Sequence, residues 1–313
     1  MALSINKPIT PRHLISDAVR WMTAGDRVAL LTLVAIEGSA PYPLGSQMLV
    51  NQRGEFLGQI TGGCAEIALA EQAVKAITER QNCTQRYGLD SPFFDIQLPC
   101  GSGIDIFIDV ATSLQHYQEL ERDLESRVQS THHFDTQVGG FTKTYRPNER
   151  LIVLGQGPIL ECLCRLALAS GFEVICIVQA ANAIAPPEVQ GLITSELQTG
   201  QSQFYDYCDD YTALVSLFHE HEYETQVLTN ALASKAFYIG ALGSRATQAK
   251  RLTALSGAGV DANQLERIHG PVGLDIQSET PAQIAISILA EIIQKMPKEP
   301  LIKDNAEVGA SNE

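Results

Sequence analysis

The second half of the chain alternates apolar strands with helices, and this alternation constrains the fold more than any other feature. An apolar run at 150–154 leads through the turn Gly155-Gln156-Gly157 into a helical pattern at 159–170, and a second apolar run follows at 173–178. Such runs, separated by a helix, are typical of parallel strands buried on both faces. The same pattern continues with strands expected at 212–218 and 236–239 and helices at 224–233 and 246–256. The sequence therefore predicts an α/β protein with a C-terminal, Rossmann-like, doubly wound parallel sheet.

The first half of the chain follows a different plan. Apolar runs at 27–36 and 47–50 are followed by a polar turn at 51–54 and a return segment at 55–60, which predicts a hairpin. From Cys64 onward apolar residues recur every three or four positions, so a helix is expected to begin at this cysteine. Further strands are expected at 94–98 and 104–110, with a polar helix at 114–128. These elements predict a smaller N-terminal α+β domain.

The length of the chain, 313 residues, predicts two domains. Residues 137–147 are rich in glycine and end in proline, which is typical of an interdomain linker or a connecting hairpin. We expect an N-terminal domain at 1–148 and a Rossmann-like domain at 149–296. A final helix is expected to begin at Thr280-Pro281, and residues 297–313 are expected to form a flexible tail.

The charge and the cysteines of the chain favour some partners and compartments over others. A net charge of -14 and a pI near 4.9 disfavour nucleic acid and anionic membranes, because both require a basic surface. No apolar run approaches the ~18 residues of a membrane helix, and the first residues lack the apolar stretch of a signal peptide. Seven cysteines, an odd number, do not suggest a secreted disulfide framework. We therefore expect a cytoplasmic protein with mostly reduced thiols.

Cys64 follows Gly62 and Gly63 in the first motif that points to chemistry. At a helix N-terminus, where peptide N–H groups converge, a thiolate is stabilised relative to the thiol. Such a sulfur can attack, ligate a metal or accept sulfide; alternatively, Cys64 is a small packed residue after a tight turn. Cys100, in a second glycine-rich turn, is a candidate companion. The remaining cysteines are expected to pack in the Rossmann domain (Cys162, Cys164, Cys176) or to lie in polar connections (Cys83, Cys208).

Gly155 and Gly157 match the first two glycines of the dinucleotide-binding fingerprint, between a strand and a helix. The third glycine is replaced by Leu160, and Gln179 stands near the position where an acidic residue would bind a ribose. The turn therefore predicts phosphate binding, whereas NAD(P) binding is disfavoured.

Two further segments follow predicted strands and are expected at the same edge of the sheet as Gly155. His219 and His221 follow the strand at 212–218. They could ligate a metal ion, although two histidines are fewer ligands than a protein zinc site usually has. Ser244 and Arg245 open a helix and suit an anion, the alternative being a tight turn with a solvated arginine. In the first domain Ser39 lies in a turn-rich loop at 38–45, which either contacts a ligand near Cys64 or serves only as a turn.

Six segments occur in order along the chain and together resemble one family. They are GSAPYPLGSQMLV, GQITGGCAE, LPCGSGIDI, LIVLGQGP, FYIGALGSR and IHGPVGLDIQSETPAQIAISILAEI. This set, within about residues 13–295, resembles the XdhC/CoxI family of xanthine dehydrogenase accessory proteins. The resemblance implies a chaperone of the molybdenum cofactor (molybdopterin) that protects this cargo, assists its sulfuration and delivers it to a xanthine dehydrogenase-type molybdenum hydroxylase.

The resemblance also implies roles for individual residues. Cys64 and Cys100 become the reactive cysteines, with Cys64 the candidate molybdenum ligand. The implied cofactor contacts are Ser39, Gly62, Gly63, Gly155, Gly157, His219, His221, Gly240, Gly243, Ser244 and Arg245. Implied partners are the hydroxylase and a cysteine desulfurase, and a homodimer is expected as the commonest assembly. Tyr42 departs from the family, because related chains usually carry a basic residue there.

Two other functions remain as hypotheses. The Rossmann-like domain suits an NAD(P)-dependent oxidoreductase, against which Gln179 argues. A relay in which Cys64 and Cys100 cycle through a persulfide or disulfide is compatible with the chaperone function.

Overall fold

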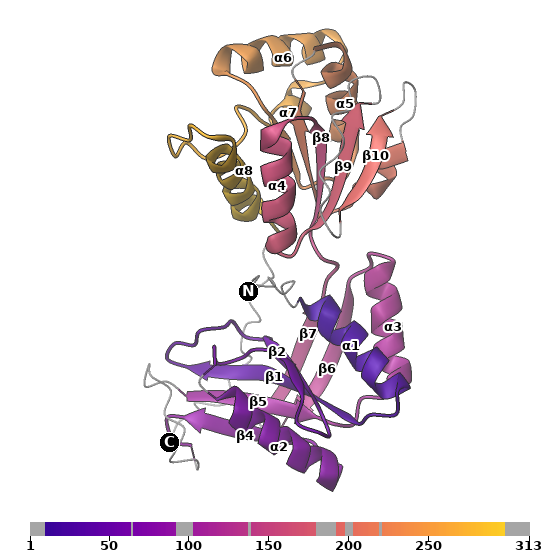
Figure 1. The fold of residues 1–313 in the computed structure, drawn as a ribbon, viewed down its shortest axis with the longest axis vertical. Helices are drawn as coiled ribbons and strands as arrows, with labels where there is room; N and C mark the ends of the chain where they lie inside the picture. The colour runs from indigo at the N-terminus through magenta and orange to yellow at the C-terminus, as the bar shows by residue number, and fades with distance from the viewer. Residues whose placement is uncertain are drawn as a thin grey trace, which may run out of the picture. The chain divides into compact units, whose positions relative to one another are not determined.

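The computed structural model describes residues 10–63, 65–91, 103–136, 139–179, 192–197, 203–218 and 221–297. The chain forms two compact units, one ending at Pro147 and the other beginning at Asn148 (Figure 1). Among the described residues, no helix combines the length and the apolar character needed to cross a membrane.

The N-terminal unit is built on a five-stranded antiparallel sheet with the order β3-β2-β1-β5-β4. Its strands are β1 (Val28–Glu37), β2 (Gln47–Asn51), β3 (Phe56–Gly58), β4 (Cys83–Gly88) and β5 (Gly103–Asp109). The central strand β1 is buried on both faces because alternate residues, such as Leu30 and Leu31, enter different cores. The sheet is therefore the middle of three layers.

Helices cover both faces of this sheet (Figure 1). On one face α2 (Glu66–Glu79) packs Leu69, Ala73 and Ile77 against the strands. On the other face lie α1 (Pro11–Thr23) and α3 (Leu114–Glu125). A hairpin of β6 (Ser130–Thr136) and β7 (Gly139–Tyr145) adds Phe134 and Phe141 to an aromatic cluster with Phe107 of β5. The glycine-rich segment before residue 147 thus supplies a hairpin strand rather than a linker.

The C-terminal unit contains a six-stranded, entirely parallel sheet with the order β10-β9-β8-β11-β12-β13. Its strands are β8 (Arg150–Gly155), β9 (Glu173–Gln179), β10 (Ile193–Leu197), β11 (Thr212–Leu217), β12 (Tyr238–Ala241) and β13 (Ile268–His269). Counted along this unit the order is 3-2-1-4-5-6, which is that of dinucleotide-binding Rossmann domains. The predicted doubly wound parallel sheet is therefore confirmed.

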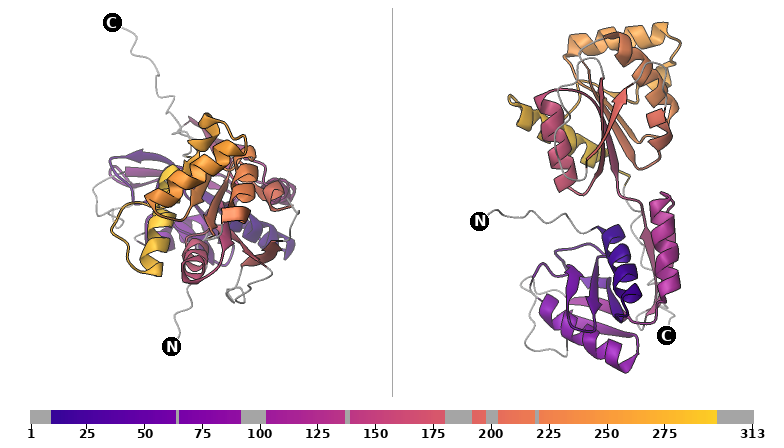
Figure 2. Two further views of the ribbon diagram at one scale, coloured as in Figure 1. Left: turned by 90° about the horizontal axis from the view of Figure 1, so that it is seen from above. Right: turned by 45° about the vertical axis from the view of Figure 1, so that its right-hand side comes forward.

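Four long helices cover the two faces of the parallel sheet (Figure 2). One face carries α4 (Pro158–Ala169) and α8 (Pro281–Lys295), and the other carries α5 (His221–Ala233) and α6 (Arg245–Gly257). Two short elements complete the unit: the 3-10 helix η2 (Gln203–Tyr207) and the helix α7 (Ala262–Leu265). The predicted start of α8 is confirmed, because Thr280 and Gln283 form a reciprocal capping box.

Several details differ from the sequence-based expectations. Helix α2 begins at Glu66 rather than at residue 64. Cys208, expected in a polar connection, is buried in the core beside α5, and Cys83 is half-buried in the edge strand β4. Cys164 and Cys176 are buried as expected. The strand expected at 94–98 lies outside the described residues.

Candidate functional site

The carboxylate of Glu66 organises the loop that leads into α2. Its Oε1 accepts hydrogen bonds from the backbone N–H groups of Ile60 (3.1 Å) and Thr61 (2.7 Å). Its Oε2 accepts bonds from the Thr61 hydroxyl (2.6 Å) and from the N–H groups of Gly63 (2.8 Å) and Ala65 (3.3 Å). The Thr61 hydroxyl oxygen itself accepts a bond from Ala65 N–H at 2.9 Å. One side chain therefore holds the backbone on both sides of residue 64.

Glu66 is buried, with 4% of its surface exposed, while Gly62 and Gly63 lie at the surface. Burial favours the neutral acid, but the hydrogen bonds from Thr61 and Ile60 outweigh it and hold the pKa of Glu66 below its ordinary value. The carboxylate is therefore ionised at neutral pH.

This arrangement bears on the peptide N–H groups expected near Cys64. Those of Gly63 and Ala65 both donate to Glu66, so two of the amides next to this cysteine in the chain are bonded to an internal carboxylate. The apolar periodicity that predicted this helix does not include Glu66, so sequence reasoning missed its role. A signal was present: a glutamate at the first helical position, next to a glycine turn, is suited to bind the free amides there. Cys64 and Cys100 lie outside the described residues.

The loop at 38–45 packs against the Gly62 turn. A Cβ atom placed on Gly62 would lie 3.8 Å from Pro41 Cβ and 3.9 Å from Tyr42 Cε2. The Tyr42 hydroxyl also donates a 3.0 Å hydrogen bond to Gln59 Oε1. The structure thus brings together the two loops that hold Ser39 and the Gly62-Gly63 pair, and Ser39 is exposed.

A basic group reaches the same loop from a distant part of the sequence. Lys143 of β7 is 6% exposed, and its Nζ would lie 3.3 Å from a Cβ placed on Gly45. The positive charge beside this loop thus comes from a strand about 100 positions further along the chain. No local motif could have revealed this, because the two positions meet only in the folded unit.

In the Rossmann unit, Gly155 and Gly157 form the turn between β8 and α4. A Cβ on Gly155 would lie 3.0 Å from the backbone of Leu217 in β11, so the glycine permits close approach where the strand order reverses. Gly157 caps α4 and faces open space, and Pro158 occupies the first helical position. Leu160, in place of the third glycine, is buried in the core. A glycine turn that leads from a parallel strand into a helix N-terminus is the arrangement that Rossmann domains in general use to bind phosphate.

Ser244 and Arg245 begin α6 at the carboxyl end of β12. The Ser244 hydroxyl caps the helix by accepting a 3.1 Å bond from Thr247 N–H, and Arg245 is exposed. Gly243 packs against Thr247, where an added Cβ would lie 2.9 Å from Cγ2.

The packing beside Gly240 offers an explanation of this glycine that does not require a cofactor. A Cβ there would lie 2.5 Å from Val272 and 2.8 Å from the Tyr238 ring. Protein side chains thus occupy the space beside Gly240, and packing accounts for this glycine.

A buried ion pair holds the loop before Ser244 and was not detectable as a motif. Arg251 of α6 lies 2.9 Å from Glu224 of α5, and the two side chains are 2% and 4% exposed. The same Arg251 nitrogen donates to the Leu242 carbonyl at 2.6 Å, while the other terminal nitrogen donates to Gln248. These bonds join α5, α6 and the end of β12.

Glu291 is the centre of a second polar cluster in the Rossmann unit. It accepts bonds from the Tyr238 hydroxyl (2.5 Å) and Gly273 N–H (2.7 Å), and His269 Nδ1 lies 3.5 Å away. The His269 and Tyr238 rings stack at 4.6 Å. Burial opposes ionisation, but the bonds from His269, Tyr238 and Gly273 lower the pKa of Glu291 to about 2.

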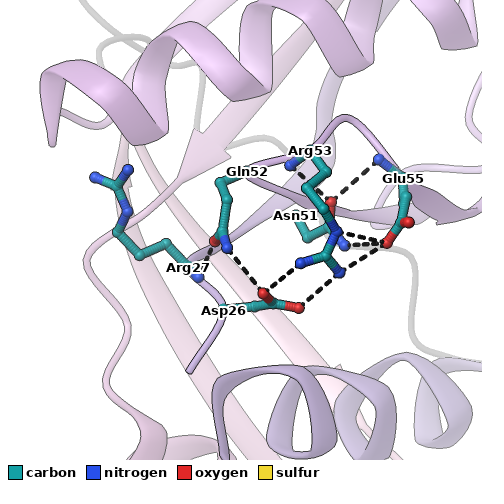
Figure 3. Close-up of polar contacts among 6 residues, drawn as sticks. All are labelled: Asp26, Arg27, Asn51, Gln52, Arg53 and Glu55. Carbon is teal, nitrogen blue, oxygen red and sulfur yellow. Dashed lines mark hydrogen bonds and ion pairs between the residues drawn. The ribbon is translucent and has the colours of Figure 1, made fainter. Parts of the chain in front are cut away.

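A third polar cluster, at the surface of the N-terminal unit, joins the β2–β3 turn to the residues just before β1 (Figure 3). Arg53 lies between Asp26 (2.6 Å) and Glu55 (2.9 Å), and hydrogen bonds from Arg53 lower the pKa of both carboxyl groups. Gln52 also donates to Asp26, at 2.8 Å. Because its charges satisfy one another, this cluster is best explained as a structural link.

The predicted histidine pair is only partly described. His219 lies outside the described residues, and His221 is the first residue of α5. Within the described ranges, no group of three or more His, Cys, Asp or Glu side chains is placed to hold a metal ion.

Fold and loops together define a class of protein: a Rossmann unit with a phosphate-type turn, joined to an α+β unit that displays a glycine turn beside a cysteine. The profile of the XdhC Rossmann domain matches residues 151–292, and that of the XdhC and CoxI family matches residues 21–88. The chain belongs to the XdhC/CoxI family, which confirms the resemblance seen in its sequence.

Two curated relatives and one solved structure illustrate this similarity. The chain is 31% identical, over 90% of its length and 87% of the relative's, to the "Molybdenum cofactor insertion chaperone PaoD" of Escherichia coli K12. It is 28% identical to a Bacillus subtilis 168 protein named as a probable xanthine dehydrogenase component, over 90% of this chain and 96% of the relative. A crystal structure of a Bacillus halodurans protein, described as a xanthine dehydrogenase, has the same fold, with a TM-score of 0.74, 22% identity and coverage of 90% and 95%.

Proposed function

We propose that this protein is a chaperone that binds the molybdenum cofactor, protects it, assists its sulfuration and delivers it to a xanthine dehydrogenase-type molybdenum hydroxylase. The observation that carries the proposal is the 31% identity to a molybdenum cofactor insertion chaperone over 90% of the chain. The presence of a phosphate-type turn in one unit and a glycine-cysteine turn in the other supports it. The same proposal places the protein in the cytoplasm as a homodimer, with a cysteine desulfurase as a further partner.

The Rossmann unit is proposed to bind the phosphate of the pterin. Gly157 leaves the first turn of α4 open, so an anion can approach its free amides. Ser244 and the exposed Arg245 begin the helix after β12 and suit the same negatively charged group. Local amides are important here, because a chain with a net charge of -14 does not attract an anion by its overall field.

The N-terminal unit is proposed to contribute sulfur chemistry through Cys64, with Cys100 as its companion. A thiolate is a suitable ligand for molybdenum, and by attacking the outer sulfur of a donor persulfide it can take over that sulfur atom while the donor thiolate leaves. Transfer onward requires the hydroxylase to bind the cofactor more tightly, or docking to weaken its binding by the chaperone, because a carrier cannot release a ligand against its own affinity.

The test is anaerobic purification from cells that make the cofactor, followed by measurement of molybdenum and pterin per chain. Wild-type protein should carry both and should activate hydroxylase that lacks cofactor. Cys64→Ala should lose molybdenum retention and delivery, whereas Cys83→Ala, in the edge strand β4, should match wild type. Wild-type protein without pterin, or a fully competent Cys64→Ala variant, would contradict the proposal.

An NAD(P)-dependent oxidoreductase is the second candidate, favoured by the strand order of the parallel sheet. Saturable NADH binding that competes with pterin would support it. A thiol relay through Cys64 and Cys100 would instead leave labelled sulfur on one of the two cysteines after exposure to a sulfur donor.

A further inference from the structure

Glu66, at the start of α2, accepts hydrogen bonds from the loop that precedes the helix. It accepts five of them, donated by four residues from Ile60 to Ala65. Gly63 and Ala65, the two neighbours of Cys64 in the chain, donate to the same oxygen, Oε2. Two peptide groups that share one acceptor are fixed relative to each other. The backbone entering and leaving residue 64 is therefore held by one atom.

The Thr61 hydroxyl strengthens this arrangement. It accepts a hydrogen bond from Ala65 N–H at 2.9 Å and donates one to Glu66 Oε2 at 2.6 Å. Thr61, at one end of the turn, is therefore bonded to both Ala65 and Glu66 at the other end. Thr61 is buried, as Glu66 is, whereas Gly62 and Gly63 are exposed. The polar groups that fix the turn thus lie beneath it, and the surface of the turn is left for a ligand.

The carboxylate also fills the position that an external anion would take at these amides. Amides at a helix N-terminus attract phosphates and carboxylates, but here an internal carboxylate already accepts their hydrogen bonds. A phosphate-bearing cargo would gain little at this turn, and its anionic part is better held by the Rossmann unit.

We propose that Glu66 is a positioning residue: it holds the backbone of Gly63 and Ala65, the chain neighbours of the cysteine on which the proposed function depends, in the arrangement that cofactor binding requires, and it keeps other anions from these amides. This inference rests on the proposed function. Glu66 acts through the backbone, because its burial leaves it almost no surface for direct contact with a cargo.

The test compares Glu66→Gln with Glu71→Gln in the full-length protein, Glu71 being an exposed carboxylate of the same helix. A carboxamide replaces one acceptor oxygen by a donor, so the bonds on that side of the turn are lost. Amide exchange at Gly63 and Ala65 should accelerate by at least about tenfold, and cofactor retention should fall by at least about tenfold, because the loss of even one of these hydrogen bonds has an effect of that size. Glu71→Gln should match wild type in both measurements.

A second pair of variants keeps the test decisive if Glu66→Gln fails to fold. Thr61→Val removes the bridging hydroxyl and should accelerate exchange at the turn, whereas Thr61→Ser keeps the hydroxyl and should restore slow exchange and retention. Ile77→Ala, at a buried site in the last turns of α2, should lower the melting temperature yet leave exchange at Gly63 and cofactor retention unchanged. If Glu66 serves only to stabilise the fold, cofactor retention should instead fall in every variant in proportion to the loss of melting temperature.

The outcomes separate this inference from the proposed function. Wild-type protein that never binds the cofactor would overturn the function, while faster exchange in Glu66→Gln would still support the holding of the turn by Glu66. Unchanged exchange in Glu66→Gln, or wild-type retention by Glu66→Gln and Thr61→Val, would overturn the positioning role.

Discussion

The two units each place a glycine turn before a helix, yet they use the amides of that turn differently. At the start of α2 the first helical residue is Glu66, whose carboxylate accepts hydrogen bonds from the loop. At the start of α4 the first helical residue is Pro158, which lacks an N–H, and the acidic residue of the first turn, Glu161, pairs with Arg165 at 2.8 Å. The amides of one turn are bonded to an internal carboxylate, whereas the other turn leaves open space at Gly157 and is the one proposed to bind an anion.

The largest expected effect concerns the Rossmann unit, where the loop before Ser244 depends on a buried ion pair. Arg251→Met removes the buried ion pair with Glu224 and the hydrogen bonds from Arg251 to Leu242 and Gln248, so the free energy of unfolding should fall by about 3–5 kcal/mol. Urea denaturation measures this, with Arg165→Met, in an exposed pair, as the control. The double variant Glu224→Leu/Arg251→Met should recover part of the loss; no recovery would show that the pair itself does not hold this loop.

Direct comparison of the two first-turn glutamates gives the next largest effect. Glu66→Gln should reduce the free energy of unfolding by about 2–3 kcal/mol, because buried amides lose a charged acceptor. Glu161→Gln should cost no more than about 0.5 kcal/mol, because its pair with Arg165 is exposed. If the two substitutions lowered the free energy of unfolding equally, the contrast between the turn before α2 and the turn before α4 would be contradicted.

The pH dependence of stability tests whether a carboxylate of the Rossmann unit, Glu291, is also stabilised in its ionised form by hydrogen bonds. The pKa of Glu291 is lowered from 4.5 to about 2. Its stabilisation, roughly 2–3 kcal/mol, should therefore be complete above pH 4.5 and be lost as the pH falls towards 2. Urea denaturation between pH 7 and pH 3 should show a steeper loss for wild type than for Glu291→Gln; parallel curves would contradict the assigned hydrogen bonds.

Alanine substitutions in the two glycine turns should have the smallest effect on stability, and they distinguish the turns by their binding of inorganic phosphate. Gly63 and Gly157 both have positive φ angles, of 101° and 95°, and neither has an atom within 4 Å of an added Cβ. Alanine at either position should therefore cost a similar amount, about 1 kcal/mol, through backbone strain alone. Only Gly157→Ala should weaken the binding of inorganic phosphate in calorimetry. Equal weakening by both variants would mean that both turns bind anions.

The sequence predicted most of the fold because apolar periodicity reports burial directly. The run at 150–154 and the helix after it became β8 and α4, and the capping residues at Thr280 marked the start of α8. Helices α1 and α7 and the strands β4, β6, β10 and β13 were missed. β13 has only two residues, and β4 is a half-buried edge strand, so neither carries a clear pattern.

The site was predicted less completely because its supporting contacts are not local. Lys143 meets the loop at Gly45 only in the folded sheet, and Arg251 meets Glu224 across 27 positions. Gly240 was interpreted as a ligand contact although the Tyr238 ring occupies the space beside it. Glu66 was the exception, since its position beside the glycine turn was visible in the sequence, although the apolar periodicity of the helix does not include it.

The most direct test of the contrast between the turns is hydrogen exchange along the full-length protein with and without millimolar inorganic phosphate. The account predicts slower exchange in residues 155–160 and no change in residues 60–63 and 65–67. Protection at 60–67, or none at 155–160, would contradict the assignment of one turn to positioning and the other to anion binding.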